Sequence, residues 1–285
     1  MPPNALPGDE RMPGRRLPRG EERVYHLGLR PGELPDSVLV PGDPARARRI
    51  AESWDRSEAL AQNREFLSFR GRYGGVDLGV VSSGIGGPAM AIVVEELARL
   101  GVRRIVRVGS CGAIDPRLRT GDLAISLAAA RFDPTSRLYA PLEYPAVAEP
   151  ALLRALASAA AAGRFRYRVG ITATVGSFYL DQGRSGFGGF LPEEARRMPA
   201  LLRKLGILNI EMECATLLTI AAIYGIEAGA LCTVYGDRED GRPVPEDPSP
   251  AIRVANEALR HRATEGPSAG RRPAPTRPRT ARRGG

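Results

Sequence analysis

The feature that most constrains the fold is a repeated pairing of short apolar segments, each ending in a glycine loop, with stretches of helical periodicity. Residues 37–43 (SVLVPGD) predict a buried strand and a turn, and residues 44–54 predict the helix that follows. Residues 76–87 repeat the strand and glycine loop, and residues 88–101 predict a helix that starts at a proline and stops at a glycine. This alternation is typical of the α/β class.

The same pattern continues without a linker or an internal repeat. It predicts further strands at 103–114, 121–130, 167–176 and 228–236 and further helices at 150–163 and 213–225. We therefore expect a single domain over residues 23–263. The flanks lack this periodicity: residues 1–22 mix Pro, Gly and both charges, and residues 264–285 are rich in Arg and Pro, so we expect two disordered extensions.

Charge and cysteine content exclude several classes of protein. The net charge of +9 is concentrated in residues 266–285, which hold six arginines and no acid, so a specific nucleic-acid partner is not expected. The three cysteines are dispersed, which disfavours a disulfide framework and a zinc site. We see neither an apolar run of the ~18 residues that span a membrane nor a signal peptide, and therefore expect a cytoplasmic protein with no membrane partner.

Ligands of α/β sheets bind at the carboxyl ends of strands, so four loops matter most: 42–46, 83–88, 109–112 and 235–238. The second loop imitates the dinucleotide fingerprint GxGxxA at Gly84, Gly86 and Ala89. The next strand, however, ends without the acidic residue that would bind a ribose hydroxyl. We therefore do not predict a dinucleotide cofactor.

Two arginines indicate an anion site. Gly42 lies on a predicted turn and Arg46 at the start of a helix, where backbone N–H groups favour anions, although a solvated arginine is the simpler interpretation. Arg107 interrupts an apolar strand, and a buried charge costs several kcal/mol unless it is paired. It binds either an anion or a structural carboxylate, and Ser110 adds a hydroxyl at the end of that strand.

Two polar segments carry side chains that can bind a sugar and a base. Glu211 and Glu213 precede an apolar helix, where a carboxylate either accepts hydrogen bonds from a ribose diol or stabilises the helix terminus. Phe178, Gln182 and Arg184 offer a stacking face, an amide and a guanidinium, which match the edge of uracil. A polar loop around a core phenylalanine is the alternative.

Taken together, these segments resemble the nucleoside phosphorylase-I superfamily and, within it, the uridine phosphorylase family. The resemblance spans about residues 25–262 and rests on YHLGL, VPGDPARARRIAE, NREF, SSGIGGPAMAIVVEEL, RVGSCGAI, APLEYPAVA, FYLDQGR and NIEMECATLL. It implies a three-layer α/β/α domain with a central mixed twisted sheet. It also implies a pentosyltransferase that cleaves uridine with inorganic phosphate to uracil and ribose 1-phosphate in nucleoside salvage, with no organic cofactor.

The resemblance also implies roles for individual residues. The phosphate-binding residues would be Gly42, Arg46, Arg107, Ser110 and, from a neighbouring subunit, Arg64. The nucleoside-binding residues would be Phe178, Gln182, Arg184, Glu211, Met212, Glu213, Arg238 and, from the neighbour, His26. Arg107, Glu213 and Arg184 would be the catalytic residues. Family members form hexamers built from dimers that share their active sites.

Three departures from the family pattern keep alternatives open. Cys111 replaces a stronger hydrogen-bonding residue in the phosphate loop, and Ala89 stands where a cation-binding serine occurs, so no metal is predicted. Asp237 resembles the aspartate of purine-cleaving relatives. A purine nucleoside phosphorylase or a nucleosidase of the same superfamily is therefore the first alternative, and a non-catalytic nucleoside-binding protein is the second.

Overall fold

The computed structural model describes residues 22–236 and 247–265, and these form one α/β domain around a ten-stranded sheet. Its strands are β1 Ser37–Pro41, β2 Arg56–Asn63, β3 Phe66–Tyr73, β4 Val76–Val81, β5 Arg104–Ala113, β6 Leu123–Arg131, β7 Ala146–Val147, β8 Tyr167–Thr174, β9 Asn209–Glu211 and β10 Glu227–Gly236. The α-helices are α1 Pro44–Glu52, α2 Gly87–Leu100, α3 Pro134–Tyr139, α4 Pro150–Ala162, α5 Glu193–Lys204, α6 Cys214–Ile223 and α7 Ser249–Thr264. Two short 3-10 helices, η1 Leu180–Gln182 and η2 Phe187–Gly189, precede α5.

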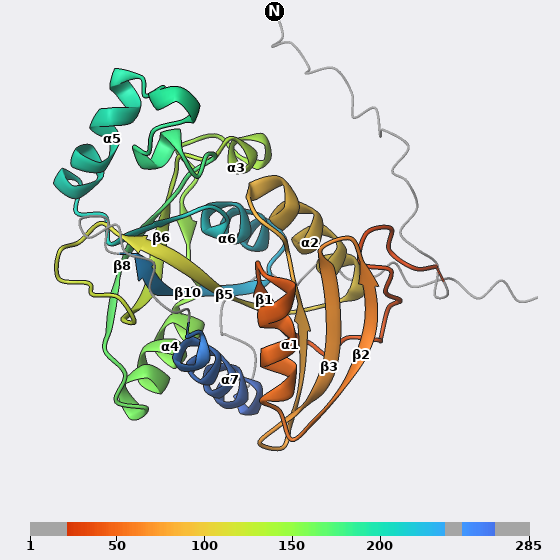
Figure 1. Ribbon diagram of the computed structural model, residues 1–285. Coiled ribbons are helices and arrows are strands. Elements are labelled where there is room, and N and C mark those ends of the chain that lie inside the picture. Colours follow the sequence, from red (N-terminus) through yellow and green to blue (C-terminus); the bar gives the residue numbers. More distant parts are fainter. Residues whose placement is uncertain (1–21, 237–246, 266–285) are drawn as a thin grey trace, which may run out of the picture.

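The sheet is mixed, as predicted, and part of it closes on itself. Its strand order is β10-β6-β8-β9-β5-β1-β4-β3-β2, with β7 on β6, and β10 also pairs with β5. That last pairing joins β5, β9, β8, β6 and β10 into a ring, from which β1, β4, β3 and β2 extend as an open wing (Figure 1). The strands β1, β5 and β10 are parallel neighbours; β1 ends at Pro41 beside Val108 in the middle of β5, whereas β10 runs beside β5 as far as Gly112.

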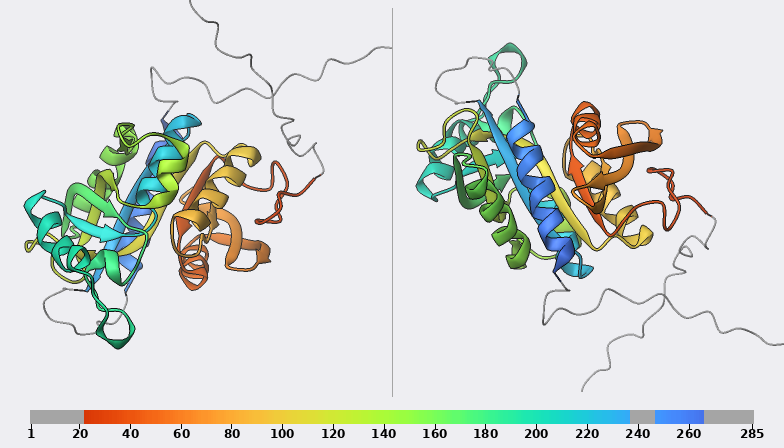
Figure 2. Two further views of the ribbon diagram at one scale, coloured as in Figure 1. Left: turned by 90° about the horizontal axis from the view of Figure 1, so that it is seen from above. Right: turned by 90° about the horizontal axis from the view of Figure 1, so that it is seen from below.

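Helices cover both faces of the sheet, which confirms the predicted three layers (Figure 2). On one face, α2 and α6 share a core that includes Met90, Leu97 and Leu217. On the other face, α1, α4 and α7 share a core that includes Ile50 and Leu156. Helix α6 is apolar all round and is buried from Cys214 to Ala221, as expected for a helix inside the domain.

The predicted helix ends are confirmed. Asp43 caps α1 by accepting a hydrogen bond from the N–H of Ala45 at 2.8 Å, and Pro44 occupies the first helical position. Helix α2 ends at Gly101, whose φ of 90° is the left-handed conformation that favours glycine.

The β2–β3 hairpin, α3, α5 and α7 were not predicted from the sequence. Strand β2 is exposed over its first four residues, so it carries little of the apolar pattern that marks a strand. The predicted flanking extensions lie outside the described residues, apart from residues 22, 264 and 265. None of the helices that the structure describes combines the length and the apolar character that a membrane span requires.

Candidate active site

The parallel pairing of β1, β5 and β10 brings the predicted phosphate residues together. In the register of these strands, Val40 of β1 and Ala230 of β10 both pair with Arg107 of β5. The chain leaves β1 into the turn at Gly42 and enters α1, which carries Arg46 in its first turn. Segments that are far apart in the sequence therefore meet at one edge of the sheet, as predicted.

The loop after β1 and the loop after β4 meet at Gly42 and Gly84. The N–H of Gly84 donates to the carbonyl of Gly42 at 2.9 Å, and a Cβ atom on Gly42 would lie 3.1 Å from the carbonyl oxygen of Gly84. The two backbones approach closely because residue 42 has no side chain.

Arg46 is buried, which excludes the solvated alternative. Its Nη1 donates to the carbonyl of Val108 at 3.2 Å, and its guanidinium carbon lies 5.7 Å from the ring centre of Tyr235. Its Nε is buried and has no hydrogen-bond partner among the described residues. A buried charged donor without a partner is costly and suits a site whose ligand is an anion.

Arg107 is also buried and pairs with two carboxylates. Its Nε donates to Glu211 at 2.9 Å, its Nη2 forms an ion pair with Glu213, and these acids raise the pKa of the arginine. Within the described part of the chain, its buried Nη1 has no partner. The two predicted alternatives, a structural ion pair and an anion site, are therefore compatible, because Arg107 pairs with acids and still presents one free donor.

Gly109 makes room for this arrangement. A Cβ atom on Gly109 would lie 2.8 Å from Nη2 of Arg107 and 2.7 Å from the sulfur of Cys232. The guanidinium of Arg107 therefore lies against the backbone of its own strand, beside the site loop.

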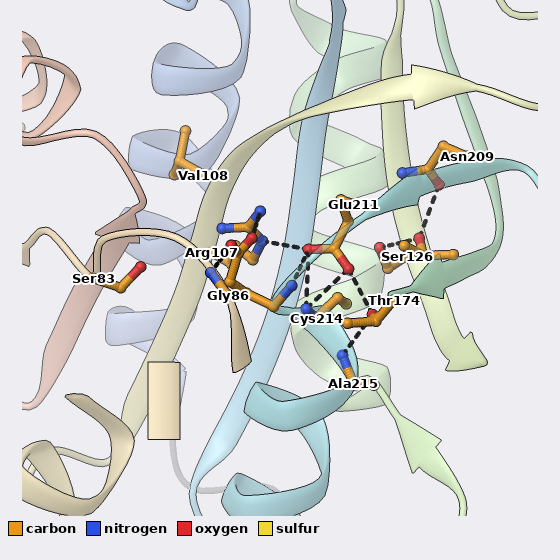
Figure 3. A network of polar contacts seen from close by, with 12 residues as sticks. Ser83, Gly86, Arg107, Val108, Ser126, Thr174, Asn209, Glu211, Cys214 and Ala215 are labelled. Atoms are coloured by element: carbon orange, nitrogen blue, oxygen red, sulfur yellow. Dashed lines mark hydrogen bonds and ion pairs between the residues drawn. The ribbon is translucent and has the colours of Figure 1, made fainter. Parts of the chain in front are cut away.

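Glu211 and Glu213 have different hydrogen-bond partners, although the sequence suggested the same two roles for both: binding a ribose diol or stabilising the helix terminus. Glu211 accepts from Thr174 at 2.5 Å, from the N–H of Glu213 at 2.8 Å and from the N–H of Cys214 at 3.0 Å (Figure 3). It therefore stabilises the amino end of α6 while it holds Arg107. Its predicted contact with a nucleoside stays a prediction, since these donors already surround its oxygens.

Glu213 occupies the N-cap position of α6, but its side chain accepts no hydrogen bond from that helix. Its carboxylate instead accepts from the N–H of Gly86, at the start of α2, and pairs with Arg107. Burial raises the pKa of Glu213, although the charge of Arg107 opposes this shift. Glu213 is thus the carboxylate that joins the loop after β4 to the arginine of β5.

The predicted base-binding residues lie together on the segment between β8 and α5. The guanidinium of Arg184 lies 4.6 Å from the ring centre of Phe178, and Tyr179 packs edge-on against the same ring. Gln182 is buried, and its side chain forms no recorded hydrogen bond with the residues that the structure describes. This free amide fits the predicted role as a reader of a base edge, which stays a prediction.

Three further residues near the site, Ser110, Cys111 and Met212, differ in burial. Ser110 is half-buried, whereas Cys111 packs among Leu208, Cys232 and Val234, where burial raises the pKa of its thiol. Met212 packs partly against the core beside β9. The substituted Cys111 side chain thus belongs to a small apolar cluster.

His26 and Arg64 lie apart from this cluster of arginines and acids. Nδ1 of His26 lies 2.9 Å from the buried carboxylate of Glu96 on α2, and Arg64 is exposed at the β2–β3 turn with a φ of 54°. No recorded contact within residues 22–236 and 247–265 joins either one to Arg46 or Arg107 of the same chain. Arg238 and Asp237 lie outside the described residues.

Three functional neighbours escaped the residue-level predictions. Thr174 holds Glu211, the N–H of Gly86 holds Glu213, and the ring of Tyr235 lies over Arg46. No motif marks Thr174 at the end of its strand or Tyr235 at the end of β10. The loops that contain Gly86 and Tyr235 were singled out, but only the tertiary contacts identify these atoms.

Comparison with known proteins agrees with this geometry. Residues 36–264 match the sequence model of the phosphorylase superfamily. The uridine phosphorylase of Thermococcus kodakarensis is 44% identical over 244 residues, which cover 85% of this chain and 88% of the relative. The uridine phosphorylase of Escherichia coli is 38% identical over 83% of this chain and 97% of its own length. A guanosine phosphorylase of Halorubrum lacusprofundi is 37% identical over 74% of this chain and 83% of its own.

Proposed function

Because this chain belongs to the phosphorylase superfamily, we propose that it is a uridine phosphorylase, which cleaves uridine with inorganic phosphate to uracil and ribose 1-phosphate. The observation that carries the proposal is a pair of buried arginines, Arg46 in the first turn of α1 and Arg107 on β5. Nε of Arg46 and Nη1 of Arg107 lack partners among the described residues, and Arg46 donates to the carbonyl of Val108, the residue that follows Arg107.

These donors suit phosphate as a co-substrate. Two guanidinium groups supply charge and N–H donors to the oxygens of an anion, and burial strengthens the attraction. Phosphate bound there would attack C1′ of the ribose as the base departs, and its negative charge would stabilise the cationic sugar of the transition state.

The acids and the base-binding segment complete the proposed mechanism. Glu213 accepts hydrogen bonds from the 2′- and 3′-hydroxyls of the ribose, since a carboxylate can accept from both members of a vicinal diol. Gln182 and Arg184 donate to the uracil carbonyls, where negative charge develops as the base leaves. The reaction needs neither a metal nor an organic cofactor.

We further propose a homo-oligomer, a hexamer built from dimers, in which His26 and Arg64 serve the neighbouring site. The support is their position: neither contacts the arginine and acid cluster of its own chain in the described part of the structure. Several apolar side chains near them are exposed, among them Tyr25 at 72% and Ile85 at 79%. A paired subunit would cover these side chains.

Release of free base from uridine, thymidine, inosine and guanosine, each with and without phosphate, tests the function. We expect uracil release that depends on phosphate and that falls by at least about 100-fold in Arg107→Gln. Preferential release of guanine or hypoxanthine would instead support a purine phosphorylase, in keeping with the guanosine phosphorylase relative. Release without phosphate would indicate a hydrolase, and no release from any substrate would refute the proposal.

A further inference from the structure

Arg46 has unusual surroundings for a buried guanidinium. Its side chain lies in the first turn of α1, at the positive end of the helix dipole, which disfavours a cation. Among the described residues, no carboxylate lies within ion-pair distance of it. Arg107, by contrast, pairs with Glu211 and Glu213. The charge of Arg46 must therefore be balanced in another way.

Tyr235 supplies part of that balance. The guanidinium carbon of Arg46 lies over the tyrosine ring, 5.7 Å from its centre, within the range of a cation–π interaction. The pairing of β10 with β5 is irregular between Val234 and Gly236, so Tyr235 lies at a bulge. Bulges beside active sites commonly redirect a side chain, and here the side chain of Tyr235 meets Arg46.

An aromatic partner, unlike a carboxylate, leaves the N–H donors of an arginine free to bind a ligand. A carboxylate would accept hydrogen bonds from one or two N–H groups of Arg46, as Glu211 and Glu213 do from Arg107. The π electrons of a ring attract the charge as a whole and occupy no particular N–H. Nε of Arg46 remains a buried donor without a partner in the described residues.

We propose that Tyr235 is a positioning residue of the phosphate site. Its ring holds the guanidinium of Arg46 against β5, where Nη1 donates to Val108, and leaves the Nε donor of the arginine to phosphate. The inference rests on the proposed function. It assigns to Tyr235 an effect on phosphate binding alone, since no contact of Tyr235 with the sugar or the base is proposed.

The test compares Tyr235→Leu with Tyr235→Phe. We expect Tyr235→Leu to raise the KM for phosphate about fivefold, because the cation–π contact is lost. The KM for uridine should change less than twofold, and Tyr235→Phe should retain the wild-type KM for phosphate, because it keeps the ring. Phe69→Leu is the matched control, since Phe69 makes the corresponding contact with Arg48 of the same helix, 5.9 Å from the ring centre.

A double-mutant cycle adds a readout that a general loss of packing would not reproduce. In an Arg46→Ala background, Tyr235→Leu should have no further effect on the KM for phosphate, since the ring acts through the arginine. Equal increases in both KM values, an unchanged KM for phosphate, or a Tyr235→Phe variant as poor as Tyr235→Leu would each overturn the proposal.

Calorimetric titration with inorganic phosphate separates this proposal from the proposed function. Wild-type protein that binds phosphate about fivefold more tightly than Tyr235→Leu would support the positioning role, even if uridine were not cleaved. Equal phosphate affinity of the two proteins would refute the positioning role, even if wild-type protein released uracil.

Discussion

Glu211 and Glu213 lie two residues apart in the chain, yet the fold gives them different partners. Glu211 is surrounded by a hydroxyl, two backbone N–H groups and the Nε of Arg107. Glu213 has the N–H of Gly86 and Nη2 of Arg107, and burial raises its pKa. At the residue scale, one acid supports the architecture, and the other is the one that we propose binds the sugar.

The first prediction concerns Glu213→Gln. Loss of a charged acceptor of ribose hydroxyls should lower kcat/KM for uridine by about 10- to 100-fold. The loss should be smaller for 2′-deoxyuridine, which lacks one of the two hydroxyls. Steady-state kinetics on the two substrates check this, and equal losses would contradict the assigned role.

The same carboxylate predicts a pH dependence. Protonation removes the negative charge that makes Glu213 a strong acceptor, so kcat/KM for uridine should fall as the pH decreases. Because the pKa of Glu213 is raised, the midpoint of that fall should lie above the ordinary glutamate value of 4.5. Glu213→Gln should lack this acidic limb, and a variant that retains it would assign the titration to another group.

At the scale of elements, the glycines after the strands decide how closely the loops and side chains approach. Gly42 admits the carbonyl of Gly84, and Gly109 admits the guanidinium of Arg107 beside Cys232. Gly112 lies further along the same strand, and a Cβ atom there would meet only the side chain of Ile210, at 3.4 Å. Strand β5 therefore contains one glycine required by the site and one that tolerates a methyl group.

Gly109→Ala and Gly112→Ala test this difference. The methyl group of Gly109→Ala would displace Arg107, so we expect at least a tenfold fall in kcat/KM, because a small misplacement of a catalytic group is costly. Gly112→Ala should remain within about twofold of wild type. Equal activity of the two variants, with both folded by circular dichroism, would contradict the proposed packing of Arg107.

At the scale of the whole molecule, the positions of His26 and Arg64 suggest a shared site. The β2–β3 turn lies beside the loop after β4, since a Cβ atom on Gly84 would lie 2.8 Å from Cγ of Glu65. Arg64 is exposed at that turn, and Ile85 is exposed in the loop after β4. A neighbouring subunit docked there would receive Arg64 in its own site.

Subunit complementation tests the shared site. In a mixed dimer of Arg64→Ala and Arg107→Gln subunits, one site carries both substitutions and the other carries neither. Co-expression should therefore restore about a quarter of wild-type activity, while each variant alone is nearly inactive. Activity of the mixture no higher than the average of the two variants would show that each subunit uses its own Arg64.

The basic tail gives a further prediction for the whole chain. Residues 266–285 follow α7 and lie outside the family match, which ends at residue 264. Deletion of this segment should leave kcat/KM for uridine unchanged within about twofold. A large loss of activity would assign the tail a part in assembly or catalysis.

The sequence by itself determined the class of fold, the strands and helices around the site, and most of the residues that meet there. Apolar periodicity and glycine punctuation are local signals, so they placed β1, α1, α2 and β5 correctly. The exposed strand β2 carried little of that signal. The tertiary structure alone decided the ring closed by β10 and β5, the different partners of Glu211 and Glu213, and the contact of Tyr235 with Arg46. Each of these depends on residues that the chain separates and only strand pairing brings together.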